Sequence, residues 1–288
     1  MTLPLQRIDD HALVAPTADD FRSALRVLDP RSFDQLWTEL CREAGLPRGC
    51  YLLEVAELEA LAAAVTARPG AVGLIGRDLG VRVASYHALS GRASSSAAGA
   101  RDWGRAALET LLRGRPERVS RIREVADLDL FSDEARVVLD KAAKEAAERF
   151  GTPIGLVSIV LQGSQVFAGA HGLQGWIRDV RGTPVEWSLC ATTLRTREPY
   201  LVPEARANVL QRTNPLVEHH GLVSYAGVPL ITSSGQVLGT QCLLSDTPRA
   251  YSDEEIDELQ GMADRLVAEL ERAHRSAGPI ASGRETAG

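Results

Sequence analysis

The pattern that most constrains this chain lies at residues 131–161, where a capped helix runs into a β-hairpin. Ser132 is a typical N-cap residue, and two acidic residues follow it at the positive end of the predicted helix. Apolar residues at helical spacing continue to Phe150, where Gly151-Thr152-Pro153 ends the helix. A run rich in Ile, Leu and Val follows, and Gln162-Gly163-Ser164 fits the tight turn of a hairpin.

A second set of strands and a helix follow an irregular stretch. We predict strands at 199–203, 222–231 and 236–245, with Ser233-Ser234-Gly235 joining the last two. Ser252 then caps a final amphipathic helix. Antiparallel hairpins between flanking helices predict an α+β fold and argue against a parallel, doubly wound sheet.

Residues 131–272 resemble a GAF domain of the kind found in bacterial signalling proteins. The matching stretches, in family order, are TPIGLVSIV, SQVFAGAHGL, VEWSLCATTL, EPYLVPEA, NPLV and SYAGVPLITSSGQVLGTQCLLSDTPRAYSDEEIDEL. The resemblance implies a central antiparallel sheet with helices 132–150 and 252–274 on one face. The excursion 171–221 would cover the other face and enclose a pocket. We assign residues 131–274 to this domain.

The N-terminal half shows no such resemblance. We expect residues 1–16 to be a flexible lead and residues 17–91 to be a mostly helical domain. Within it, residues 72–91 suit two short helices joined by a turn at Gly80, which is the pattern of a helix-turn-helix. Its second helix would present Arg82, Ser85 and His87 to DNA. A plain helical packing unit gives the same pattern, and residues 1–92 carry no basic excess.

Two segments are predicted to connect the N-terminal half to the GAF-like domain. Residues 92–100 are small and almost uncharged, which predicts a linker. Residues 101–130 read as a basic connector helix, because arginines crowd into it around an apolar stripe at 103–112. Two interpretations remain open: the helix is exposed to solvent, or it binds an acidic partner or phosphates. Residues 275–288 are expected to form a disordered tail.

Charge and cysteine content narrow the class of protein. The 288-residue chain has a formal net charge of −6, which argues against a whole-surface nucleic-acid binder. No signal pattern and no membrane-length apolar run is present, so we expect a cytoplasmic protein with reduced thiols. The four cysteines, at 41, 50, 190 and 242, have no CxxC spacing.

The predicted pocket needs an apolar wall and a few polar groups. We expect the ligand to be a small molecule whose identity, like that of any cofactor, the sequence does not indicate. The candidate ligand-binding residues are Phe167, Trp176, Trp187, Cys190, Thr193, Asn214, Ser224 and Tyr225. Some of these side chains could instead be plain core.

The sequence gives less support to metal or haem binding and to catalysis. His219 and His220 are adjacent and His171 ends a strand, so no metal or haem site is predicted. Some GAF domains reduce free methionine sulfoxide through cysteines, which makes Cys190 and Cys242 candidates for a reductase. A redox thiol requires exposure and a lowered pKa, and neither cysteine has a basic neighbour in sequence. No hydrolase, kinase, cyclase or phosphodiesterase motif is present.

The leading hypothesis is therefore a non-catalytic GAF sensor that signals through helix packing or through a partner protein. A ligand-responsive DNA-binding regulator is the alternative, and a methionine sulfoxide reductase is a lower one. We also expect a two-fold homodimer, because the apolar stripes of the two long helices exceed what one sheet face requires. These stripes are Val138, Ala142, Ala146 and Arg149, and Ile256, Leu259, Met262, Leu266, Val267 and Leu270.

Overall fold

The computed structural model describes residues 7–8, 11, 13–14, 16–28, 30–47, 53–90 and 117–277. The predicted linker 92–100, most of the basic segment and nearly all of the predicted tail lie outside these residues. None of the helices within the described ranges is both long and apolar enough to cross a membrane.

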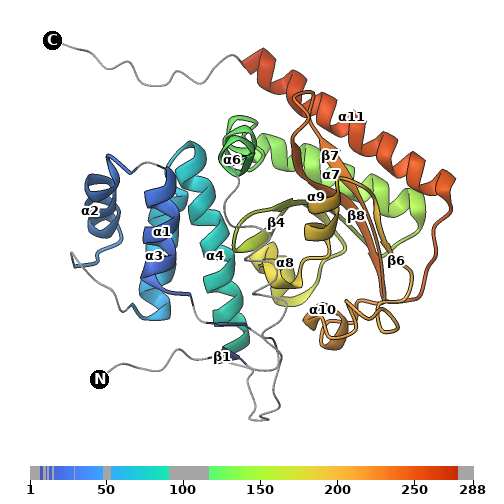
Figure 1. The fold of residues 1–288 in the computed structure, drawn as a ribbon, viewed down its shortest axis with the longest axis horizontal. Helices are drawn as coiled ribbons and strands as arrows, with labels where there is room; N and C mark the ends of the chain where they lie inside the picture. Colours follow the sequence, from blue (N-terminus) through green and yellow to red (C-terminus); the bar gives the residue numbers. More distant parts are fainter. Residues whose placement is uncertain are drawn as a thin grey trace.

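The N-terminal half is helical, as the sequence predicts (Figure 1). Its elements are β1 Arg7–Ile8, β2 Leu13–Val14, α1 Ala18–Leu28, α2 Phe33–Glu43, α3 Val55–Thr66 and α4 Gly70–Ser90. One apolar core joins α1 to α4 and is centred on side chains such as Phe21, Leu40 and Leu61. Helix α6, Glu117–Asp127, follows the segment that is not described.

The predicted helix-turn-helix at 72–91 is wrong, because α4 runs unbroken from Gly70 to Ser90. Gly80 lies inside the helix and makes no turn. A Cβ on Gly76 would collide with the backbone of Thr66 at the end of α3, and one on Gly73 with the carbonyl of Arg68 in the connection that follows. These glycines therefore allow two helices to pack closely.

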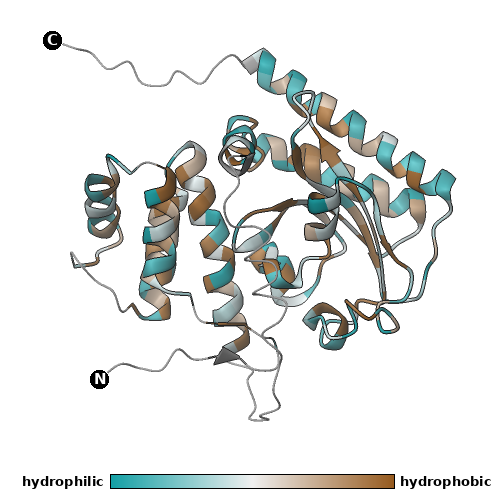
Figure 2. Cartoon of the chain, in the orientation of Figure 1, coloured by the Kyte–Doolittle hydropathy of each residue, from teal (hydrophilic) through white to brown (hydrophobic). Residues whose placement is uncertain are grey.

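Among the described residues of the C-terminal half, six strands form one antiparallel sheet in the order β5-β4-β3-β8-β7-β6. The strands are β3 Ile154–Val160, β4 Ser164–His171, β5 Gly182–Pro184, β6 Tyr200–Val202, β7 Ser224–Ile231 and β8 Val237–Ser245. The two predicted hairpins are β3–β4 and β7–β8, and β3 pairs with β8 at the centre. Figure 2 shows that these strands are mainly hydrophobic, as expected of a sheet covered on both faces.

Helices α7, Asp133–Phe150, and α11, Asp253–Ala277, cover one face of the sheet, as the resemblance implies. Ser132 caps α7 by accepting a hydrogen bond from the Ala135 backbone N–H. The helix lies so close to β3 and β4 that a Cβ on Gly155 or Gly169 would collide with its carbonyl groups. We call this side of the sheet the helix face.

The opposite side, which we call the loop face, is covered by short elements. These are α8 Gly175–Val180, the 3-10 turn Val185–Trp187, α9 Cys190–Thr196 and α10 Pro215–Glu218. Leu13, from the N-terminal lead, is buried in this same core. The lead was predicted to be flexible, and this stays a prediction; within it, the apolar side chain of Leu13 packs on a surface far along the chain.

Candidate ligand-binding face

Five flat side chains meet on the loop face, and we call them the aromatic cluster: His11, Trp176, Trp187, His219 and His220. The two tryptophan rings are 6.1 Å apart and edge-on, and the Trp187 and His220 rings are 5.9 Å apart. His11 completes the cluster from the lead, with its ring 4.6 Å from that of His219. Such rings offer stacking surfaces to a flat ligand.

Hydrogen bonds hold Trp187 at the centre of this cluster. Its Nε1 donates to the carbonyl of His11 over 3.0 Å. Asn214 caps α10 by accepting from the Leu216 N–H, and its Nδ2 donates to the Trp187 carbonyl over 3.0 Å. The side chain of Asn214, which was predicted to bind ligand, therefore makes hydrogen bonds that position Trp187. The Nε1 of Trp176, by contrast, is buried and has no hydrogen-bond partner among the residues that the structure describes.

A second group of side chains, which we call the thiol cluster, lies where α9 rests on the sheet. It consists of Cys190 from α9, Tyr225 from β7, Thr240 and Cys242 from β8, and Ser158 from β3. The sulfur atoms of Cys190 and Cys242 are 3.8 Å apart, and the Tyr225 hydroxyl donates to the Cys190 sulfur over 3.3 Å. Ser158 and Thr240 are cross-strand partners. All five side chains are buried.

The surroundings within the thiol cluster shift the pKa values of the two cysteines in opposite directions. Burial raises the pKa of Cys190, but its hydrogen bonds with Cys242 and Tyr225 act against burial, and the pKa is lowered. Donation to Cys190, together with burial, raises the pKa of the Cys242 thiol well above its usual range. Cys190 is therefore the thiol of the pair that ionises first.

The structure brings most of the predicted ligand-binding residues to the loop face. Phe167, Trp176, Trp187, Cys190 and Tyr225 belong to its core, and Thr193 is fully buried in α9.

Ser224 does not join them, because strand residues alternate between faces and Tyr225 takes the loop face. The Ser224 hydroxyl donates instead to the carbonyl of Thr247. No cluster of metal-ligating side chains occurs in the part of the chain that the structure describes.

Sequence reasoning missed His11, Ser158 and Thr240. Ser158 and Thr240 could have been found from the sequence, because alternate residues of a strand share a face and both lie on the face that Cys242 occupies. His11 gave no such signal, since it reaches the cluster only through tertiary packing.

Helix α4 is fastened to the sheet beside this face through what we call the α4 clamp. Asp78 accepts hydrogen bonds from the Gly163 N–H, at 3.0 Å, and from the Ser164 hydroxyl, at 2.7 Å. One nitrogen of Arg82 donates to the Glu186 carboxylate and to the Gly163 carbonyl, each over 2.9 Å. Glu186 directly precedes Trp187, so the clamp contacts the segment that carries the aromatic cluster.

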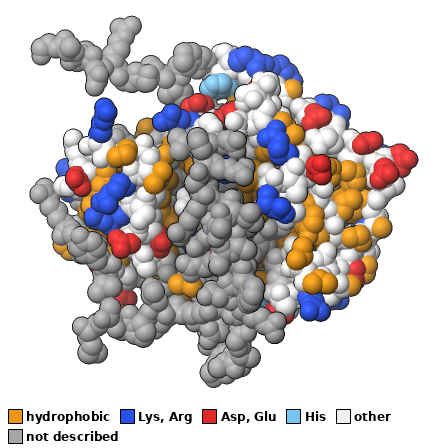
Figure 3. Space-filling view, in the orientation of Figure 1, with side chains coloured by type: hydrophobic (Ala, Val, Ile, Leu, Met, Phe, Trp, Pro, Cys, Tyr) orange, Lys and Arg blue, Asp and Glu red, His pale blue; other side chains and the backbone are white. Residues whose placement is uncertain are grey.

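The clamp also corrects the predicted DNA contacts. Arg82 is committed to Glu186, and Ser85 is fully buried. Only His87 is exposed, and its Nδ1 lies 2.6 Å from the Glu59 carboxylate. Where described residues are visible in Figure 3, acidic side chains stand among the basic ones. The helix predicted to read DNA is therefore packed against the sheet.

Comparison with known proteins shows which family the C-terminal half matches. Residues 134–270 match the family model of the GAF domain. A cyclic di-GMP phosphodiesterase of Pseudomonas aeruginosa is 32% identical over 157 residues, which make up 54% of this chain and 24% of that protein. The chain thus spans about a quarter of that relative, 24% of its length.

The solved structures that match the chain have lower identity. The type II free methionine-R-sulfoxide reductase of Thermoplasma acidophilum is 18% identical, with a TM-score of 0.41, over 50% of this chain and 96% of that one. The GAF domain of an Acinetobacter phosphoenolpyruvate-protein phosphotransferase is 14% identical, with a TM-score of 0.40, over 57% of this chain and 99% of that one.

Proposed function

Because residues 134–270 belong to the GAF domain family, we propose that this chain is a non-catalytic sensor that binds a small molecule on the loop face. The observation that carries the proposal is the aromatic cluster, with the buried and unpartnered Nε1 of Trp176 inside it. A buried donor without a partner is rare in proteins, and a ligand acceptor would satisfy it.

The cluster favours a flat heteroaromatic ligand that carries a hydrogen-bond acceptor. Stacking on tryptophan and imidazole rings suits such a ring system, and the ring nitrogen of Trp176 is a donor only. The name of the Pseudomonas aeruginosa relative includes a cyclic dinucleotide, so that class belongs among the compounds to test. Its phosphodiesterase activity is not part of the proposal.

We expect a compound of this class to raise the melting temperature and to change the tryptophan fluorescence. The panel comprises nucleotides, cyclic dinucleotides, amino acids and aromatic metabolites. Trp176→Phe keeps an aromatic ring, although a smaller one, and removes the donor, so it should weaken binding about fivefold, or about 1 kcal/mol. Trp37 has an Nε1 that is likewise buried without a partner among the described residues, but it lies in the separate core of the N-terminal helices, so Trp37→Phe is the matched control and should bind normally. Failure of every compound to bind would refute the sensor proposal.

The other functions weighed from the sequence lose their structural basis. The DNA-binding alternative is not retained, because its reading helix is packed against the sheet. A reductase would require a thiol that a methionine sulfoxide can reach, and Cys190 and Cys242 are 2% and 0% exposed. The proposal therefore treats the chain as non-catalytic.

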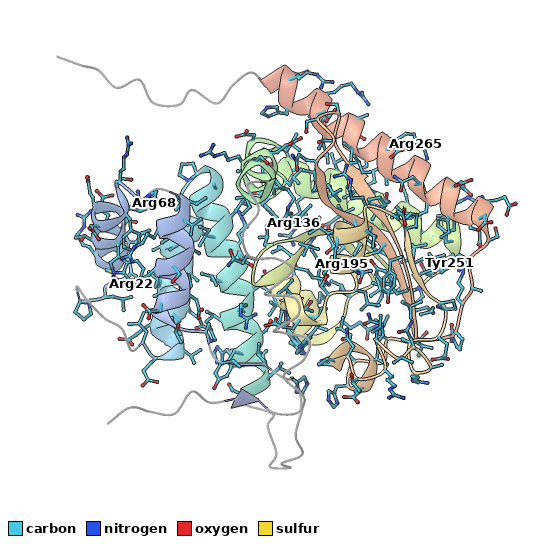
Figure 4. The ribbon with its side chains drawn as sticks, viewed as in Figure 1. Arg22, Arg68, Arg136, Arg195, Tyr251 and Arg265 are labelled. Carbon is cyan, nitrogen blue, oxygen red and sulfur yellow. The ribbon has the colours of Figure 1, made fainter. Side chains whose placement is uncertain are left out.

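We propose that the sensor acts as a two-fold dimer through a groove between α7 and α11. The groove has a volume of about 310 Å³ and an apolar floor that includes Val138, Ala142 and Met262. Lys141 and Glu145 border it on α7, and Arg265 and Glu269 border it on α11. Figure 4 shows Arg265 on α11. Alternating charges of this kind are self-complementary in a two-fold pair of helices, which is the argument for a second copy as occupant.

The predicted stripes supply only part of this apolar surface, since Val138, Ala142 and Met262 line the groove. Ile256, Leu259, Leu266, Val267 and Leu270 are buried within a single chain. Val137, which also lines the groove, is 71% exposed.

We expect light scattering coupled to size exclusion to give twice the chain mass of 31.0 kDa. Val137→Glu should return the protein to monomers without unfolding it, since an exposed site tolerates charge. Val27→Glu, at a residue 69% exposed on α1, is the matched control and should stay dimeric. A mass near that of one chain at every concentration would contradict the dimer.

A further inference from the structure

The thiol cluster contains two cysteines that face each other from separate elements. Cys190 is the first residue of α9, a helix of seven residues, and Cys242 lies in the central strand β8. Their sulfur atoms are 3.8 Å apart, whereas a disulfide requires about 2.05 Å. Since loops join α9 at both ends, the helix can supply this movement more readily than the strand.

The cluster also favours the thiolate form of one of the two sulfurs. The Tyr225 hydroxyl donates a hydrogen bond to the Cys190 sulfur over 3.3 Å. Hydroxyl donors stabilise a thiolate, which is the nucleophilic form of cysteine. Cys242 keeps its proton and stands beside it, as a resolving thiol does.

We propose that Cys190 and Cys242 are a redox modification site that a small peroxide converts into a reversible disulfide. The Cys190 thiolate attacks one peroxide oxygen, the O–O bond breaks, and the released hydroxide takes a proton from solvent to become water. Cys190 is then a sulfenic acid. The Cys242 sulfur attacks the Cys190 sulfur, the S–O bond breaks, and hydroxide leaves with the Cys242 proton as a second water. The peroxide gains the two electrons that the sulfurs lose.

The disulfide would change the loop face. It would draw α9 towards β8 and break the hydrogen bond from Tyr225 to the Cys190 sulfur. Helix α9 follows the turn that carries Glu186 and Trp187, so the shift would reach both the α4 clamp and the aromatic cluster. Burial also sets the class of oxidant, because a molecule about as small as water can enter where a larger reagent cannot.

The test exposes the full-length reduced protein to hydrogen peroxide and maps its disulfides by mass spectrometry without reduction. We expect a peptide pair that joins Cys190 to Cys242 and that dithiothreitol separates. N-ethylmaleimide, a bulkier reagent, should leave both thiols unlabelled in the folded protein. Cys41→Ala, which removes a different buried thiol, is the matched control and should react as the wild type does.

Two variants test the roles of the partners. Cys242→Ser should stop the reaction at the Cys190 sulfenic acid, which dimedone traps after unfolding. Tyr225→Phe should slow disulfide formation several-fold, because the thiolate loses a donor. The proposal fails if peroxide leaves the folded protein without this disulfide, or if the bond forms only once denaturant has unfolded the chain. Neither readout involves a ligand, so failure here is separate from failure of the sensor proposal.

Discussion

Replacing Arg82 with alanine is expected to lower the free energy of unfolding by about 3–5 kcal/mol, the range for breaking a buried ion pair. The Arg82 and Glu186 side chains are only 13% and 15% exposed, so solvent screens their interaction weakly. The substitution leaves the Glu186 carboxylate without its partner and the Gly163 carbonyl without one of its donors. Urea denaturation at neutral pH measures the change.

The matched control is Arg178→Ala, which removes an ion pair with Asp179 whose side chains are 68% and 67% exposed. Exposed pairs contribute about 0–1 kcal/mol, so this variant should be close to wild type. The double variant Arg82→Ala/Glu186→Ala should lose less than the sum of its single changes, because no unpaired charge remains. Equal losses in Arg82→Ala and Arg178→Ala would show that the clamp does not hold α4.

The sequence predicted the elements of the GAF domain well because their signals are local. Ser132 and Gly151 delimit α7, and the residue alternation of β7 and β8 follows from which face each side chain covers. The helix-turn-helix prediction failed because glycine has two uses within a helical pattern. It permits a turn, and it also permits close approach of another helix, as Gly76 does against Thr66.

The candidate site could be predicted only in part. The aromatic and sulfur-containing residues of the loop face were identified from their place in the GAF pattern. His11, Leu13 and Asp78 were not, because each reaches its partners from a separate part of the chain. His11 accepts a hydrogen bond from Trp187, which is 176 residues away in sequence. A buried carboxylate such as Asp78 is also uncommon enough that pattern reasoning leaves it exposed.

The buried Asp78 makes the stability of the α4 clamp depend on pH. Burial raises the pKa of Asp78 to about 6, although Ser164, Gly163 and Arg82 each act to lower it. In an unfolded chain an aspartate titrates near about 3.9. Between these two values the folded protein holds a proton that the unfolded chain has released. Stability from this group is therefore greatest below about pH 4 and is lost as the pH rises through 6.

We expect Asp78→Asn to remove this dependence, because the amide carries no charge and can still accept one hydrogen bond. Relative to wild type, its free energy of unfolding should rise by about 3 kcal/mol between pH 4 and pH 7, since each pKa unit is worth about 1.4 kcal/mol. Urea denaturation of both proteins across this range gives the difference directly and cancels the other titrating groups. Ser164→Ala removes a hydrogen bond that lowers the pKa, so it should extend the loss of stability to higher pH. A difference that is flat, or that falls as the pH rises, would show that Asp78 is not a buried, proton-holding carboxylate.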